Sequence, residues 1–358
     1  MANTSFSAVK ISGIVTCVPE RVCSFADDAA LMEMSPNQIN RIQKNIGLDK
    51  RHVARTETTT LDLCVEAATD LLSGLGVASN AVDGLVFVTQ TPDHLQPSNA
   101  AIIHGRLGLS TSCASFDVNL GCSGFVYGLW LAHMMIASGT CTSVLLFAGD
   151  TLSKCVNPKD RSVAPLFGDA GSATLVQASA DNRRTYFSLH TDGSGSEHIR
   201  IPAGGFRQPR SAETTQETVT ADGNVVSAND LQMNGGEVFN FSIKVEPAAI
   251  AEIVEYSGYS LDDVDFVVFH QANKYIISNI VRRIGMPLEK APCGTVAKYG
   301  NQSSASIPAT INDALAGNVF GQNKKLILSG FGVGLSWASC LVDMNLDYCP
   351  PVKICKGR

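Results

Sequence analysis

The sequence has no pair of cysteines spaced as Cys-x-x-Cys, although it contains 11 cysteines among its 358 residues. Without such a pair, nothing indicates a zinc ribbon or a thioredoxin-like redox site. Scattered cysteines, odd in number, are typical of reduced thiols in the cytoplasm, where most are buried as small apolar side chains. We therefore expect a cytoplasmic protein without a bound metal.

Charge and long apolar runs are scarce as well. Charged residues make up 17% of the chain and the net charge is −6, which argues against a general nucleic-acid binder. No uninterrupted apolar run reaches the roughly 18–20 residues that span a bilayer, and residues 1–10 lack the pattern of a secretory signal. No Gly-x-Gly-x-x-Gly opens a helix after the first strand, which argues against a dinucleotide site. We expect neither nucleic-acid nor membrane binding, and the low charge favours an oligomer.

What the sequence does contain is one dense apolar segment, residues 116–139, with Cys122 inside it. The segment begins like a strand, turns at Gly121 and continues as an apolar helix. A thiol at a helix N-terminus lies near free backbone N–H groups and the positive end of the helix dipole. Such a position predicts a lowered thiol pKa and a nucleophilic cysteine.

The remaining pattern alternates apolar strands with helices, which favours parallel-type strands covered on both faces. Residues 82–87 resemble residues 264–269, which suggests two similar α/β halves, residues 1–178 and residues 179–358. Between the halves, residues 191–230 are polar and predict long loops with a hairpin around Asp222-Gly223. We interpret residues 348–358 as an extended tail.

Three local sequences in the second half could act with Cys122. His270 follows an apolar strand, Asn301 lies in a loop that opens a helix, and residues 329–337 form a glycine-rich turn. Alone, each has an ordinary structural interpretation as a hydrogen-bonded histidine, a cap or a turn. Together they offer a nucleophile, two N–H donors for one oxygen, and a backbone able to approach closely enough for an oxyanion hole.

This ordered set resembles the thiolase-fold condensing enzymes, and most closely β-ketoacyl-acyl-carrier-protein synthase III. The resemblance implies an α/β fold of two similar halves, with mixed sheets stacked in α-β-α-β-α layers, and a homodimer. The first half would carry the nucleophile, and the second the histidine and asparagine. The matching motifs are residues 117–125, 168–173, 270–273, 300–306 and 331–337.

The resemblance also implies a reaction. Cys122 would take an acyl group from coenzyme A or a carrier protein, with the backbone N–H groups of Cys122 and Val333 as the oxyanion hole. His270 and Asn301 would stabilise the enolate formed when malonyl-acyl carrier protein loses carbon dioxide. No cofactor is implied beyond these thioesters. Two alternatives stay open: an acyltransferase that makes no carbon–carbon bond, and an inactive subunit of a heterodimer.

Further substrate contacts follow from the same resemblance, and some depart from the family pattern. Arg41 stands where the family often has the tryptophan of an adenine clamp, and Gln96 stands where a phenylalanine bounds the acyl pocket. These changes predict a larger or functionalised acyl group rather than acetyl, and leave fatty-acid initiation and a specialised pathway both open. The implied substrate-binding residues are Arg41, Gln96, Arg161, Gly235, Phe239, Asn273 and Phe331.

Four basic residues could dock an acidic carrier protein: Lys244, Lys274, Arg282 and Arg283. Complementary charge is the ordinary means of steering such a partner onto an otherwise acidic enzyme. A plain solvated helix face explains the same residues equally well.

Overall fold

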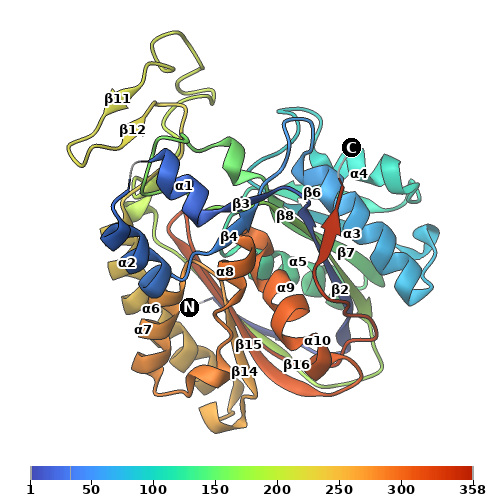
Figure 1. The fold of residues 1–358 in the computed structure, drawn as a ribbon. Helices are drawn as coiled ribbons and strands as arrows, with labels where there is room; N and C mark the ends of the chain where they lie inside the picture. Colours follow the sequence, from blue (N-terminus) through green and yellow to red (C-terminus); the bar gives the residue numbers. More distant parts are fainter. Residues whose placement is uncertain (1, 33, 357–358) are drawn as a thin grey trace.

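The computed structural model describes residues 2–32 and 34–356, which form two mixed sheets with helices between and outside them (Figure 1). The first sheet has the strand order β17-β2-β8-β7-β5-β6. Its strands β5, β6 and β7 are parallel, whereas β8 runs antiparallel to both β2 and β7. Their bounds are β2 Val9–Pro19, β5 Gly84–Val88, β6 Ala114–Val118, β7 Ser143–Asp150, β8 Ala170–Ala178 and β17 Lys353–Cys355.

The second sheet has the order β1-β9-β16-β15-β14 and repeats the mixed pattern. Here β14 and β15 are parallel, and β16 runs antiparallel to β15 and β9. Both sheets are therefore mixed, as the resemblance implied, and their parallel pairs are the parallel-type strands that the apolar pattern favoured. Their bounds are β1 Ala2–Phe6, β9 Thr185–Thr191, β14 Phe266–Phe269, β15 Lys324–Gly332 and β16 Ser336–Met344.

Each end of the chain adds a strand to the sheet that is built mainly from the other half of the sequence. β1 pairs with β9 in the second sheet, and β17 pairs with β2 in the first. The prediction of an extended C-terminal tail was therefore wrong for Lys353–Cys355, because Cys355 is buried and the segment adds a strand to a sheet edge. The division into residues 1–178 and residues 179–358 stays a prediction.

A layer of helices lies between the sheets. The apolar face of α5 (Gly124–Ala137) packs against β5 and β7 on one side and β15 and β16 on the other. The largest buried cluster lies here and includes Phe125, Val126 and Leu129 of α5. The rest of this layer consists of α9 Ser306–Thr310 and α10 Ala316–Val319, joined by a π-helical turn.

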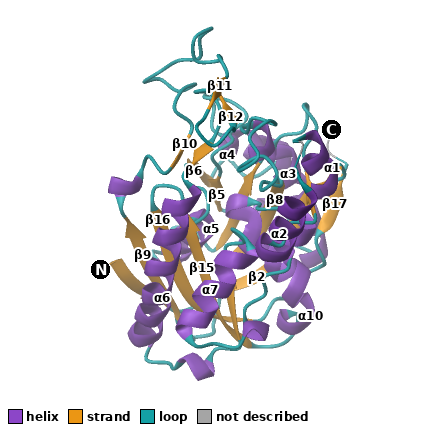
Figure 2. Cartoon of the chain, turned by 60° about the vertical axis from the view of Figure 1, so that its left-hand side comes forward, coloured by secondary structure: helices purple, strands orange, loops and turns teal. Residues whose placement is uncertain are grey.

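Helices α3 (Thr60–Leu75) and α4 (Asn99–Leu107) cover the outer side of the first sheet. On the second sheet, α6 (Gly235–Ser257) and α7 (Lys274–Ile284) take this place, beside β15 and β16 in Figure 2. The resulting order of layers is α-β-α-β-α, as predicted.

The remaining elements surround one end of the sheets. Ser35 caps α2 in a capping box with Gln38, and Pro36 is the first residue of the helix. The hairpin predicted around Asp222-Gly223 is confirmed as β11 and β12, which project at the upper left of Figure 1. The bounds are α1 Phe25–Leu31, α2 Pro36–Ile46, α8 Thr295–Tyr299, β3 Val22–Ser24, β4 Lys50–His52, β10 Ile199–Arg200, β11 Thr218–Val219, β12 Val225–Val226 and β13 Gln232–Met233.

Candidate active site

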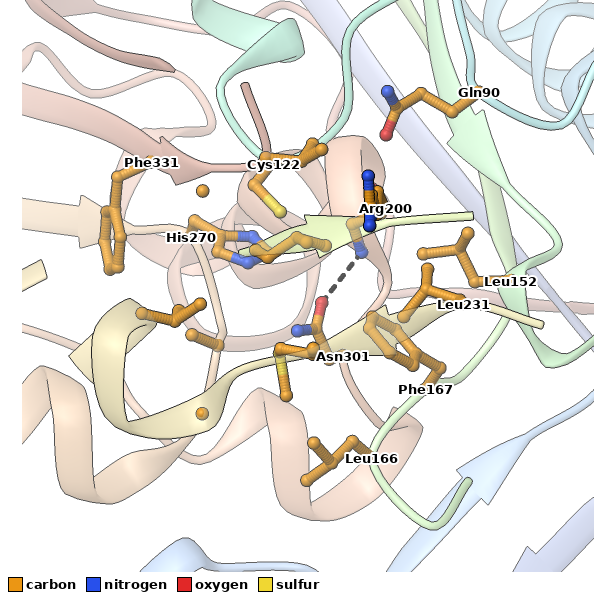
Figure 3. Close-up of a pocket in the computed structure, with 18 of the residues that line it drawn as sticks. Gln90, Cys122, Leu152, Leu166, Phe167, Arg200, Leu231, His270, Asn301 and Phe331 are labelled. Atoms are coloured by element: carbon orange, nitrogen blue, oxygen red, sulfur yellow. Dashed lines mark hydrogen bonds between the residues drawn. The ribbon is translucent and has the colours of Figure 1, made fainter. Parts of the chain in front are cut away.

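One cavity of about 380 Å³ lies where β6, β14 and β15 end, and it brings together the three residues predicted to act (Figure 3). Cys122 lies in the turn between β6 and α5, His270 directly follows β14, and Asn301 follows α8. All three line the cavity, as does Val333 from the turn after β15. Residues far apart in the sequence thus meet at the carboxyl ends of parallel strands, where α/β proteins place their sites.

Burial raises the pKa of the Cys122 thiol to about 11, opposite to the lowering that its place before a helix predicts. Backbone N–H groups of Val333 and of Cys122 itself oppose this rise, while the negative charge of Asp150 adds to it. Because α5 begins only at Gly124, Cys122 lies in the preceding turn, and its burial outweighs the helix terminus. The resting nucleophile at neutral pH is therefore a thiol.

Glycine at position 332 makes room for the sulfur. A β-carbon built at Gly332 would lie 2.6 Å from Cys122 Sγ and 2.8 Å from its Cβ. The Gly332 backbone also has φ of 156°, which side-chain-bearing residues rarely adopt. The backbone N–H groups of Val333 and Cys122 also act on this sulfur, and they are the groups that the resemblance assigns to the oxyanion hole.

His270 is buried and neutral. Burial lowers its pKa to about 4, although a contact with the Ser303 backbone partly offsets this. Its Nδ1 lies 2.7 Å from Ser306 Oγ, which also accepts the Gln271 backbone N–H at 3.2 Å. In the tautomer in which Ser306 Oγ donates its proton to Nδ1, the Nε2 proton of His270 is the donor that faces a substrate.

Asn301 is fixed from both its backbone and its side chain. Its N–H donates to Leu166 O at 2.8 Å, and its carbonyl accepts from Gly168 N–H at 3.1 Å. Its Oδ1 accepts the Ser303 N–H at 2.9 Å, with Ser303 in the left-handed region at φ 49°. Because Oδ1 is occupied, the Nδ2 hydrogens of Asn301 are the side-chain donors left for a substrate.

A buried carboxylate that the sequence analysis missed connects these segments. Asp150, at the end of β7, accepts the Gln90 N–H at 2.7 Å, the Thr89 hydroxyl at 3.1 Å and the Ser304 hydroxyl at 3.1 Å. Burial raises the pKa of Asp150, and these donors oppose the rise. An aspartate that ends a wholly buried strand was the available signal.

The predicted substrate residues divide into two groups. Gly235, Asn273 and Phe331 line the cavity, and the Phe331 ring meets the His270 ring edge-to-face at 5.7 Å. The others lie outside this lining: Phe239, which stacks on Tyr275, and the exposed Arg41, Gln96 and Arg161. Lining residues that the sequence analysis missed include Gln90, Asn119 and Arg200.

The four basic residues predicted to dock a carrier protein are exposed on α6 and α7. Arg283 donates to the carbonyl of Ile243 at 3.0 Å, which brings the end of α7 next to Lys244. Lys274 begins α7 beside Asn273, a residue of the cavity lining. Docking of a carrier protein on these four residues stays a prediction.

No cluster of His, Cys, Asp and Glu in residues 2–32 and 34–356 is arranged to hold a metal ion. Within the same residues, no helix has the length and apolar character required to cross a membrane.

The fold and the site together define an enzyme of the thiolase-fold condensing class. Two sequence profiles match: 3-oxoacyl-[acyl-carrier-protein] synthase III over residues 116–193, and the C-terminal domain of that family over residues 254–344. The chain belongs to the 3-oxoacyl-acyl-carrier-protein synthase III family.

Known members of the family match along almost the whole chain. A putative 3-oxoacyl-[acyl-carrier-protein] synthase 3 of Campylobacter jejuni is 35% identical over 98% of both chains. A β-ketoacyl-[acyl-carrier-protein] synthase III of Streptococcus equi is 35% identical over 94% of this chain and 99% of its own. The crystal structure of a 3-oxoacyl-(acyl-carrier protein) synthase from Burkholderia xenovorans superimposes with a TM-score of 0.91, at 34% identity and 98% coverage of both chains.

Proposed function

We propose that the protein catalyses a decarboxylating Claisen condensation, joining an acyl group on Cys122 to a malonyl thioester to give a β-ketoacyl thioester. One observation carries this proposal: a neutral His270 and a pre-oriented Asn301 amide line the same cavity as Cys122. Two neutral N–H donors suit a carbonyl oxygen that becomes an enolate oxygen. A simple acyl transfer to oxygen or nitrogen forms no such enolate.

In the first half-reaction, Cys122 Sγ attacks the carbonyl carbon of an acyl thioester. The backbone N–H groups of Cys122 and Val333 stabilise the oxyanion of the tetrahedral intermediate. When the intermediate collapses, the carbon–sulfur bond to the donor breaks, and the thiol proton of Cys122 ends on the leaving thiol. The net proton count therefore does not change during acylation.

In the second half-reaction, the malonyl thioester loses carbon dioxide, and its electron pair passes to C2 as the enolate. His270 and Asn301 donate hydrogen bonds to the thioester oxygen that holds this charge. The C2 carbanion then attacks the carbonyl carbon of acyl-Cys122 and expels the thiolate. Because burial raises the pKa of Cys122, the thiolate takes up one proton from solvent at neutral pH.

The proposal requires no cofactor beyond the thioester substrates. The basic residues of α6 and α7 are proposed as the docking surface for malonyl-acyl carrier protein, and the same chemistry allows an acyl donor on coenzyme A or on a carrier. We place this reaction in the cytoplasm. We also propose a homodimer through β6, an edge strand of the first sheet.

The test compares Asn301→Ala with wild type in two assays. We expect carbon dioxide release from malonyl thioester to fall about 100- to 1,000-fold, the usual effect of losing one oxyanion donor. Acylation of Cys122, followed by mass spectrometry, should change little. Asn345→Ala, at an exposed position remote from the cavity, is the matched control. Wild-type protein that acylates Cys122 but releases no carbon dioxide would exclude condensation and favour the acyltransferase alternative.

A further inference from the structure

Two amide side chains lie in the cavity wall beside the nucleophile, and neither takes part in the proposed reaction. Gln90 lies two residues beyond the end of β5, and Asn119 directly follows β6. Val88 of β5 pairs with Val118 of β6 in the parallel register, so the two strands deliver these side chains to the same edge of the sheet. Both residues line the catalytic cavity.

The two amides are ordered relative to each other. Gln90 Nε2 donates to Asn119 Oδ1 at 3.3 Å, and the Gln90 backbone N–H donates to the buried Asp150 carboxylate at 2.7 Å. Within the described residues, Gln90 Oε1 and Asn119 Nδ2 make no further hydrogen bond. The pair therefore presents one acceptor and one donor to an occupant of the cavity.

The acceptor lies beside the segment that carries the nucleophile. A β-carbon built at Gly121 would come within 2.5 Å of Gln90 Oε1 and 2.7 Å of Val333 Cγ1. Gln90 Oε1 is thus packed beside the residue before Cys122 and near the turn that supplies an oxyanion N–H. Figure 3 shows the Gln90 carboxamide directed toward the side of the cavity that holds Cys122.

Much of the remaining wall is apolar. Arg200 is the one charged side chain among the described lining residues, and it is paired with Glu197 at 2.6 Å. An acyl chain would therefore meet neutral hydrogen-bonding groups near its thioester and hydrocarbon elsewhere. The apolar lining residues include Leu152, Leu166, Phe167, Leu231, Met233 and Val238.

We propose that the acyl group carried by Cys122 bears a hydroxyl close to its thioester carbon, at C2 or C3, and that Gln90 and Asn119 select it. The hydroxyl would donate to Gln90 Oε1 and accept from Asn119 Nδ2. A keto group lacks a proton and would leave Oε1 without a donor, and neutral amides give a carboxylate no charged partner. This inference deepens the proposed function, on which it rests, by naming the class of acyl primer.

The experiment measures acylation of Cys122 by mass spectrometry with coenzyme A thioesters of one chain length: octanoyl, 2-hydroxyoctanoyl and 3-hydroxyoctanoyl. The variants are Gln90→Met and Asn119→Leu, which keep side-chain size and remove the amide. Gln322→Met, at an exposed position that lines no described cavity, is the matched control. Thermal unfolding of each variant confirms that it is folded.

We expect wild type and Gln322→Met to prefer one hydroxyacyl donor over octanoyl, because a site built to bind a hydroxyl discriminates against its absence. Gln90→Met should reduce that preference about 10-fold, mainly by slowing the hydroxyacyl donor, and Asn119→Leu should reduce it similarly. A wild-type enzyme without hydroxyacyl preference, or a preference unchanged in both variants, overturns the inference. Carbon dioxide release is measured in parallel, so a failure of condensation appears separately from a failure of primer selection.

Discussion

At the residue scale, close contacts around Cys122 decide where its sulfur lies. Gly332 lies against Sγ, Gly330 against the Cys122 carbonyl, and the Val333 N–H at the sulfur itself. The sulfur therefore lies next to the backbone turn of residues 330–333. The absence of a side chain at position 332 is therefore part of the nucleophile's geometry.

We predict that Gly332→Ala slows acylation of Cys122 by at least about 100-fold, the usual effect of losing one oxyanion contact. The new methyl group would overlap the sulfur, and alanine is strained at φ 156°. Labelling by an acyl thioester measures the effect. Gly193→Ala is the control, since a β-carbon at Gly193 has nothing within 4 Å. Normal acylation of Gly332→Ala would contradict this account.

At the element scale, α6 places the carboxyl group of Glu246 in the protein core, next to β15. Glu246 is fully buried, accepts the Ser329 hydroxyl at 2.6 Å, and has no hydrogen-bond partner at its other oxygen within the described residues. Burial raises the pKa of Glu246 to about 8, against an ordinary value of 4.5. Between these two values the folded chain keeps a proton that the unfolded chain releases, so stability falls as pH rises.

We predict that the free energy of unfolding decreases from pH 5 to pH 8.5 by about 2–4 kcal/mol more in wild type than in Glu246→Gln. The amide cannot ionise, so it removes this contribution to the pH dependence. Urea unfolding at the two pH values provides the measurement. Glu255→Gln, on an exposed turn of the same helix, should keep the wild-type dependence. Equal pH dependence in wild type and Glu246→Gln would show that Glu246 ionises normally.

Whether a site residue could be predicted from the sequence depended on how its secondary-structure element is placed. Cys122, His270 and Asn301 were accessible because each lies in a local motif at the end of an apolar strand or in a loop that opens a helix. Gln90 and Asn119 were not, because their roles depend on the lateral register of β5 and β6. Asp150 had a local signal as the aspartate that ends a buried strand, but its partners on other segments could not be predicted. The predicted lowering of the Cys122 pKa was wrong for a related reason. The sequence shows that a helix begins near Cys122, but the segments that bury its thiol are distant in the sequence.

At the scale of the whole molecule, β6 is an edge strand of the first sheet, with no partner on its outer side among the described residues. Phe116 of β6 is 37% exposed, and Leu95 in the neighbouring loop is 78% exposed. Exposed edges and large apolar side chains are common where two protein surfaces meet. The proposed homodimer would cover both features.

We predict that Phe116→Asp prevents the proposed homodimer from forming, because the change places like charges at a shared edge. Size-exclusion chromatography with light scattering measures the mass. Phe206→Asp is the control. Phe206 is 88% exposed, lies in the loop before β11 and is distant from β6 in the sequence. A wild-type protein that runs as a monomer would remove the proposed interface.

The crossing of the chain ends has a consequence for synthesis on the ribosome. β1 is made first but pairs with β9, about 180 residues later, and β17 closes the edge beside β2 only when residues 353–355 have emerged. Such distant pairings carry a high entropic cost and form late. While residues 1–178 are translated, β1 lacks its partner strand and the first sheet lacks β17. The nascent chain therefore has to keep β1 from aggregating until β9 emerges, and the edge at β2 until residues 353–355 emerge.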